Sequence, residues 1–144
     1  MSPFSQQLKM LRVSRGLRQM ELAELLGSEQ SYVSALELGL KGPPNEKFVN
    51  QLIGVLNLSL EYQQTLIEAV VASQRKFNIP NEAPTEIYWL IHKLRQQIDR
   101  LHPTQVELIE KVLSMPLNYT MADNSMPQRI RRRSNSIHET EAKM

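Results

Sequence analysis

The sequence contains no cysteine among its 144 residues. That absence excludes a disulfide framework, a thiol nucleophile and any zinc site built on cysteine, and it fits a reducing compartment. Hydrophobic residues make up 41% of the chain, but no apolar run is long enough to span a bilayer. The N-terminal residues also lack the hydrophobic region of a signal peptide. We therefore expect a soluble, cytoplasmic protein with no membrane contact.

Signatures of catalysis and of metal binding are missing as well. The sequence has no glycine-rich phosphate loop, and no acidic and basic side chains stand at a spacing suited to acid–base chemistry. Two of the three histidines, His92 and His102, make a poor pair of metal ligands at their spacing. We expect no enzymatic activity, no metal site and no cofactor.

Acidic residues are absent from the first 20 positions, where all charged side chains are basic. These basic residues are Lys9, Arg12, Arg15 and Arg18. The net charge of the whole chain is only +2, too small by itself to indicate a polyanionic partner. A local positive edge can nevertheless meet the phosphates of a nucleic acid without a strongly basic protein behind it.

Most of the functional information lies between Gln19 and Gly39. The spacing of apolar residues predicts a short helix over Gln19–Leu26 and a second over residues 29–37. Gly27 separates them, because a helix C-terminus favours a residue that tolerates positive φ. The second helix has a polar, almost uncharged outer face. This pattern predicts a helix-turn-helix whose second helix enters a DNA major groove, and a plain amphipathic hairpin with a solvated face is the alternative.

The same stretch carries a family resemblance. Leu17–Gly27 (LRQMELAELLG) and Gln30–Gly39 (QSYVSALELG) resemble the lambda-repressor/Cro-like (XRE-type) helix-turn-helix family, and the similarity extends over residues 4–73. It implies an all-α fold that begins with a five-helix DNA-binding domain, here residues 1–77, and double-stranded DNA as the partner. It does not identify an operator or a regulated gene.

The resemblance implies base contacts by the second helix. In related proteins the matching positions read bases, and in this sequence they are occupied by Gln30, Ser31, Ser34 and Ala35. Glutamine can pair with adenine through two hydrogen bonds, whereas alanine offers only an apolar contact, for example to a thymine methyl. The set lacks the arginine that often reads guanine, so we expect DNA shape to contribute to specificity.

Phosphate contacts are expected at the edges of the same motif. The candidates are Gln19, Arg18, Tyr32, Lys41 and Arg15. Related repressors place a glutamine against a phosphate at the position of Gln19, which also suits helix capping. Tyr32 can offer its hydroxyl to a phosphate or pack against the first helix or the loop that follows the second, and both arginines are also compatible with solvated charges. Leu38 departs from the family, which has asparagine there, so we expect no side-chain phosphate contact from it.

Arg12 has two interpretations. In the family, the arginine at the matching position pairs with a glutamate near the end of the second helix, which is Glu37 here. Such a pair would hold the first helix against the recognition helix, and breaking it would leave an uncompensated charge. The alternative is a phosphate contact by Arg12.

Three further helices are predicted around the motif, over Phe4–Arg15, Asn45–Leu56 and Leu60–Lys76. The residues of the first that we expect to be buried are Phe4, Leu8, Leu11 and Val13. The apolar stripe of the second consists of Phe48, Leu52, Ile53 and Leu56. The third carries the apolar residues Leu66, Ile67, Ala69 and Val70, with Phe77 just beyond it.

The pattern changes after residue 77. Residues 78–85 (NIPNEAPT) hold two prolines and two asparagines, which predicts a linker. Residues 86–115 then predict a hairpin of two helices, Glu86–Leu101 and Thr104–Ser114. The first has a heptad seam made of Ile87, Ile91, Leu94, Ile98 and Leu101. Because such a hairpin has little core of its own, we expect it to dimerise, with packing on the first domain or on another protein as the alternatives.

Residues 116–144 are polar and are expected to be disordered. Arg129 and Arg131–Arg133 make this tail basic, either as a solvated segment or as a non-specific DNA arm.

These observations together predict a sequence-specific DNA-binding transcriptional regulator. We expect a repressor that acts as a homodimer on a two-fold symmetric operator. One alternative is an antitoxin-type regulator that binds a toxin through its C-terminal part. The other is a protein-interaction module without specific DNA binding.

Overall fold

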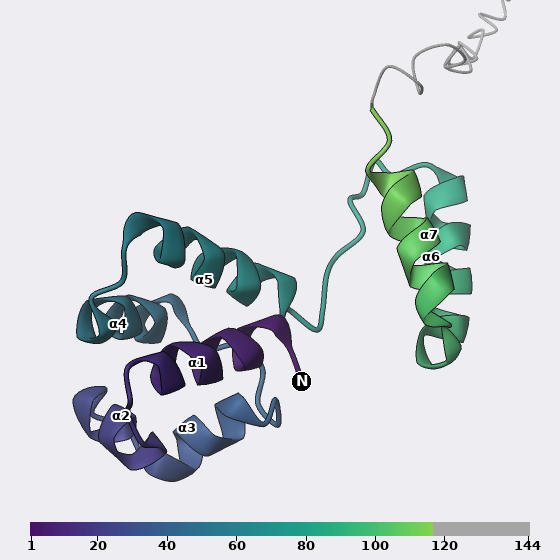
Figure 1. Ribbon diagram of the computed structural model, residues 1–144. Helices are drawn as coiled ribbons and strands as arrows, with labels where there is room; N and C mark the ends of the chain where they lie inside the picture. The colour runs from purple at the N-terminus through teal and green to yellow at the C-terminus, as the bar shows by residue number, and fades with distance from the viewer. Residues whose placement is uncertain (117–144) are drawn as a thin grey trace, which may run out of the picture. The chain divides into compact units, whose positions relative to one another are not determined.

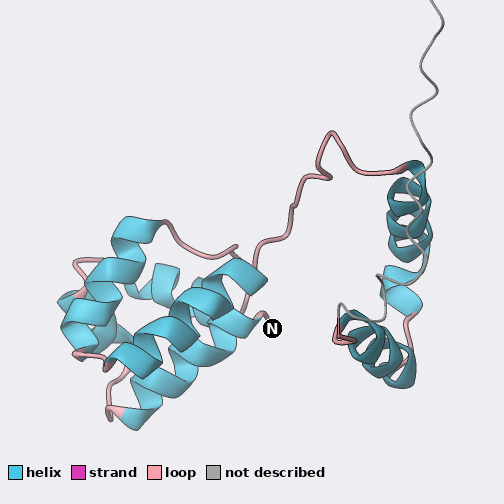
Figure 2. Ribbon diagram, turned by 90° about the horizontal axis from the view of Figure 1, so that it is seen from above, coloured by secondary structure: helices cyan, strands magenta, loops and turns pink. Residues whose placement is uncertain are grey.

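The computed structural model describes residues 1–116, and every regular element in that range is a helix (Figures 1 and 2). The predicted all-α fold is therefore confirmed for the part of the chain that the structure describes. This part divides into two compact units, residues 1–82 and a unit that begins at Ala83. None of the helices within residues 1–116 is long and apolar enough to cross a membrane. The predicted tail, residues 116–144, lies outside the described residues except for Pro116.

The first unit contains five helices. They are α1 (Pro3–Ser14), α2 (Gln19–Leu25), α3 (Gln30–Glu37), α4 (Glu46–Leu56) and α5 (Leu60–Ala72). Three of them begin with a side-chain cap: Ser2, Asn45 and Ser59 each accept a hydrogen bond from a backbone N–H of the first helical turn. Each cap satisfies a donor that the helix itself leaves unpaired.

A left-handed residue ends α2, as the sequence predicts. Gly27 has φ +60°, and the N–H of Ser28 donates to the carbonyl of Ala23 at 2.9 Å. A residue with a side chain would be strained at this φ, which explains the glycine. The tight turn brings α3 directly after α2, and the two helices pack together as a helix-turn-helix.

One buried cluster draws on all five helices of this unit. Its most deeply buried members, at most 1% exposed, are Phe4, Leu8, Leu22, Val33, Leu36, Leu52 and Leu66. Ala23 is also buried, and its small side chain lets α3 pack close to α2. Burial of one such leucine contributes about 1.5–3 kcal/mol to the free energy of unfolding. The cluster therefore stabilises the packing of α3 against α2.

The end of α5 differs from the prediction. The helix stops at Ala72 rather than at Lys76. The hydroxyl of Ser73 donates to the carbonyl of Ala69 at 2.6 Å and accepts from the N–H of Phe4 at 2.8 Å. This buried serine therefore closes the end of α5 against the start of α1.

Some apolar side chains of the first unit lie at its surface. Val13 is 58% exposed rather than buried, because Leu8 and Leu11 already occupy the inner face of α1. Ile67 and Phe77 are 50% and 66% exposed. The buried face of α5 is therefore narrower than its apolar composition suggests.

The second unit contains α6 (Thr85–Gln97), the 3₁₀ turn η1 (Ile98–Arg100) and α7 (Pro103–Leu113). The predicted helix to Leu101 is wrong in its last turn, which tightens to 3₁₀ geometry. The reason is the cap that follows: the N–H of His102 donates to Oε1 of Gln105 at 2.9 Å, and its Nδ1 accepts from the N–H of Thr104 at 3.2 Å. The extended backbone of this capping box starts α7 and cannot continue α6.

The predicted heptad seam is only partly covered within this unit. Ile87, Leu94 and Ile98 are 38%, 36% and 60% exposed. Leu94 of α6 and Ile109 of α7 line one hollow of about 140 Å³. Part of the seam therefore faces α7, and the hairpin leaves space between its own helices.

Candidate nucleic-acid interface

Glu37, the last residue of α3, anchors this helix to the rest of the unit. Its side chain is 3% exposed and accepts three hydrogen bonds. Arg12 of α1 donates two of them, from Nε at 2.5 Å and from Nη2 at 3.0 Å. Gln19 of α2 donates the third from Nε2 at 2.8 Å. One carboxylate therefore joins α1, α2 and α3.

The two charges of the Arg12–Glu37 pair compensate each other in a place that is almost closed to water. The Arg12 side chain is 13% exposed. Its hydrogen bonds to Glu37 raise the pKa of the guanidinium above its ordinary value, although burial opposes this effect. Nη1 of Arg12 also donates to the carbonyl of Leu17 at 2.8 Å. All three guanidinium nitrogens are thus engaged within the protein, which agrees with the ion-pair interpretation of Arg12.

Gln19 makes a contact that the sequence does not reveal. Its side chain donates to Glu37 and does not cap α2, so the capping interpretation is wrong. The cap position is Arg18, whose backbone N–H donates to the carboxylate of Glu21 at 2.6 Å. A side-chain amide carries two hydrogens, so the bond to Glu37 uses one of the two that Gln19 has.

The outer face of α3 carries the four predicted base readers. Gln30 and Ser31, at the start of the helix, are exposed, and Ser34 and Ala35 are partly exposed. The opposite side is buried, with Val33 fully inaccessible. The helix therefore presents a polar, uncharged surface and cannot rotate without exposing its core.

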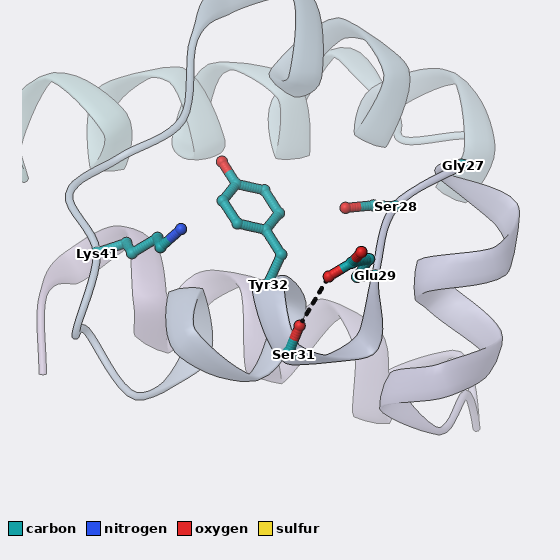
Figure 3. Close-up of a pocket in the computed structure, with 6 residues that line it drawn as sticks. All are labelled: Gly27, Ser28, Glu29, Ser31, Tyr32 and Lys41. Atoms are coloured by element: carbon teal, nitrogen blue, oxygen red, sulfur yellow. Dashed lines mark hydrogen bonds between the residues drawn. The ribbon is translucent and has the colours of Figure 1, made fainter.

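Tyr32 lies between the core and the surface. Its ring packs edge-on against Phe48 of α4, with centroids 5.5 Å apart and an interplanar angle of 85°. Nζ of Lys41 lies 5.0 Å from the centroid of the tyrosine ring. Figure 3 shows the hydroxyl of Tyr32 pointing away from α3. The ring thus packs against α4, an element that the sequence did not suggest, and Lys41 of the loop after α3 lies beside it.

A hollow of about 650 Å³ opens at the start of α3. It is lined by Gly27, Ser28, Glu29, Ser31, Tyr32 and Lys41 (Figure 3). Glu29 is not among the residues that the sequence singles out. Its carboxylate accepts a hydrogen bond from Oγ of Ser31 at 3.2 Å. Its position in the sequence could have pointed to it, because Glu29 is the charged residue directly before the uncharged polar face of α3.

The other predicted phosphate ligands lie at the edges of the motif. Arg15 and Arg18 are exposed, at the end of α1 and the start of α2. Leu38, just after α3, is 61% exposed. A missed residue is Arg75, whose Nη2 donates to the carbonyl of Gly39 at 2.6 Å and holds the loop after α3. Within residues 1–116, no three acidic or histidine side chains gather to hold a metal ion.

The comparisons with known proteins identify the first unit. Residues 3–65 match the family model of the helix-turn-helix domain, a range that contains α1 to α4 and the start of α5. No curated protein matches the chain. Domains of this kind bind DNA through the second helix of the motif, which is α3 here. Residues 3–65 are thus a helix-turn-helix domain by this match, consistent with the lambda-repressor-like (XRE-type) family that the sequence resembles.

Proposed function

We propose that this protein is a sequence-specific DNA-binding transcriptional regulator that represses by occupying an operator and blocking the polymerase. The observation that carries the proposal is that α3 is exposed on its polar face and held in place at its end. Its polar face is free, while Glu37 holds its far end through three hydrogen bonds. A helix held in this way meets DNA without first having to be ordered, so little binding free energy is lost to conformational entropy.

Gln30 is the principal base reader in this proposal. It is exposed at the start of α3, the end that contacts base edges in helix-turn-helix proteins. Its amide can donate to and accept from one adenine. Ser31 and Ser34 add single hydrogen bonds, and Ala35 meets a thymine methyl.

Phosphate contacts would frame α3 on both sides. The ligands in this proposal are Gln19, Arg18, Arg15, Tyr32 and Lys41. Such contacts set the register and orientation of the protein but carry no sequence information. Lys41 has a restricted position because its amine lies over the ring of Tyr32.

A homodimer on a two-fold symmetric operator is supported by the surface of the second unit. Between Ala83 and Pro116 no side chain is buried, and Trp89, Leu90 and Leu113 are 67%, 61% and 79% exposed. An apolar surface of this kind needs a partner. A second copy supplies the same surface, and two hairpins can form a four-helix bundle. The two α3 helices of such a dimer would then meet successive major grooves.

Selection of bound sequences from a random duplex library tests this function. The wild-type chain should enrich two half-sites about one helical turn apart, with adenine at one position of each. Gln30→Ala should relax that position and leave the others unchanged, at a cost of about 1–3 kcal/mol to the selected site.

The matched control is Gln64→Ala, an exposed residue of α5. Figure 1 shows α1 between α5 and α3, so this change should alter neither the selected site nor the affinity. An unchanged preference in Gln30→Ala would refute the assignment of this reader. A wild-type chain that enriches no sequence at low salt would instead favour the protein-interaction module.

A further inference from the structure

We infer that Glu29 is a specificity-determining residue of the DNA interface, selecting cytosine at the base that faces the start of α3 and weakening binding to DNA that lacks it. This inference rests on the proposed function. It assigns a role to an acidic side chain on a surface that must approach a polyanion.

The side chain of Glu29 is not used to cap the helix that it precedes. Its backbone carbonyl accepts from the N–H groups of Tyr32 and Val33 at 3.1 and 3.2 Å, but its carboxylate makes no cap hydrogen bond. Instead the carboxylate extends along the outside of α3 to Oγ of Ser31 (Figure 3). It therefore lies beside Ser31, which follows Gln30 at the start of the polar face.

No basic side chain neutralises this carboxylate among residues 1–116. The ion pairs formed there are Arg12–Glu37 and Glu107–Lys111. The cation that lines the same hollow, Lys41, lies over the ring of Tyr32. A DNA backbone brought against α3 would thus meet an uncompensated negative charge, which opposes binding to any sequence.

The charge is tolerated only where the DNA supplies a hydrogen-bond donor. An ionised carboxylate is an acceptor only. In the major groove cytosine presents its N4 amino group to Glu, whereas guanine N7 and O6, thymine O4 and the phosphates are all acceptors. Adenine presents a donor beside an acceptor, a pair that suits the amide of Gln30 better than a carboxylate.

The hydrogen bond from Ser31 orients the carboxylate for this contact. The hydroxyl donates to Oε2 and leaves Oε1 without a hydrogen bond in the described structure. The Glu29 carboxylate then contributes to specificity in two ways, because it attracts the cytosine amino group and repels every other surface of the DNA. A purely structural role is also conceivable physically, because a negative charge favours a helix N-terminus. That role predicts a change in stability and no change in base preference.

The experiment uses the full chain with selection from a random duplex library, followed by titration of the selected duplex and of a scrambled one. The variants are Glu29→Gln, Glu29→Asp and the control Glu61→Gln, an exposed acid in the first turn of α5. Glu29→Gln should lose about tenfold of its preference for cytosine at one position. It should also bind the scrambled duplex more tightly, with a salt dependence steeper by about one unit of slope.

Glu29→Asp distinguishes the effect of the negative charge from the effect of the side-chain length. Because it keeps the charge but is one methylene shorter, it should bind scrambled DNA as weakly as the wild type and lose the cytosine preference. Glu61→Gln should match the wild type in every measurement. If the wild-type chain enriches no sequence, the proposed function and this inference both fall. If it enriches a site and Glu29→Gln keeps the same base preference and the same affinity for scrambled DNA, the inference alone is overturned.

Discussion

The two units of this protein are both built from regular helices, but only one of them has an interior. In residues 1–82, five helices contribute to a single buried cluster. In the described part of the second unit, α6 and α7 bury no side chain. Caps and helix propensity can therefore specify a helix without specifying a stable tertiary structure. The first unit is complete as a packed domain, whereas the described part of the second leaves its apolar side chains accessible.

The ion pairs of the two units make the same contrast at the scale of single residues. Glu37 and Arg12 form a two-pronged contact with side chains that are 3% and 13% exposed. Lys111 and Glu107 of α7 lie 2.7 Å apart, but their side chains are 68% and 63% exposed. The first pair joins α1 to α3, whereas the second lies on the solvated surface of α7 alone.

Replacing one leucine in each unit by alanine should give the largest difference between the two units in the free energy of unfolding. Leu22→Ala deletes a side chain that is 0% exposed and should destabilise the first unit by about 2–5 kcal/mol. Leu94→Ala, at a side chain 36% exposed, should cost about 1 kcal/mol or less in a dilute sample. Urea unfolding measures both, with circular dichroism for the whole chain and emission of the single tryptophan, Trp89, for the second unit. Equal costs would show that the second unit is covered in the monomer and would remove the contrast.

Removing the acidic residue of each ion pair should give a smaller difference in the free energy of unfolding, again with the larger cost in the first unit. Glu37→Gln leaves the partly buried guanidinium of Arg12 without its counter-charge and should cost about 2–3 kcal/mol, below the value for a fully buried pair. Its matched control, Glu107→Gln, should cost about 0.5 kcal/mol or less. Thermal unfolding of both variants in parallel provides the test. A cost for Glu37→Gln as small as that of its control would mean that this carboxylate does not anchor α3.

The third prediction concerns the dimer surface that we propose for the second unit. Ile98→Glu places a charge on the 60% exposed part of the seam and should weaken dimerisation by about tenfold or more, roughly 1.4 kcal/mol. Sedimentation across a concentration series would measure the effect. Gln96→Glu, an exposed change on α6 away from the seam, is the matched control. A dimer that survives Ile98→Glu unchanged would place the interface elsewhere.

The helix-turn-helix is predictable from sequence because its signals are local. Gly27 marks the turn between α2 and α3, and Ser59 marks the start of α5, each through a backbone conformation or a hydrogen bond within a few residues. The same kind of reasoning fails at η1, where the choice between α and 3₁₀ geometry depends on the cap at His102. Periodicity alone cannot resolve that choice.

The contacts that position α3 are not local and are therefore harder to predict. The bond from Gln19 to Glu37 spans 18 residues, and the bond from Arg75 to Gly39 spans 36. Family resemblance supplies the Arg12–Glu37 pair, but no spacing rule supplies these two. Glu29 is likewise inconspicuous in sequence, because its importance depends on which way its side chain runs along α3.

The hydrogen bond between Phe4 and Ser73 has a consequence for how this domain can be used. It joins residues 69 positions apart and brings the beginning and the end of the first unit together. A domain whose two chain ends lie close together tolerates insertion into another chain, or circular permutation, with little rearrangement. The chain that follows Ser73 leaves from beside the N-terminus, and Arg75 within it holds the loop after α3. The DNA-binding unit is thus a self-contained module that different C-terminal segments can follow.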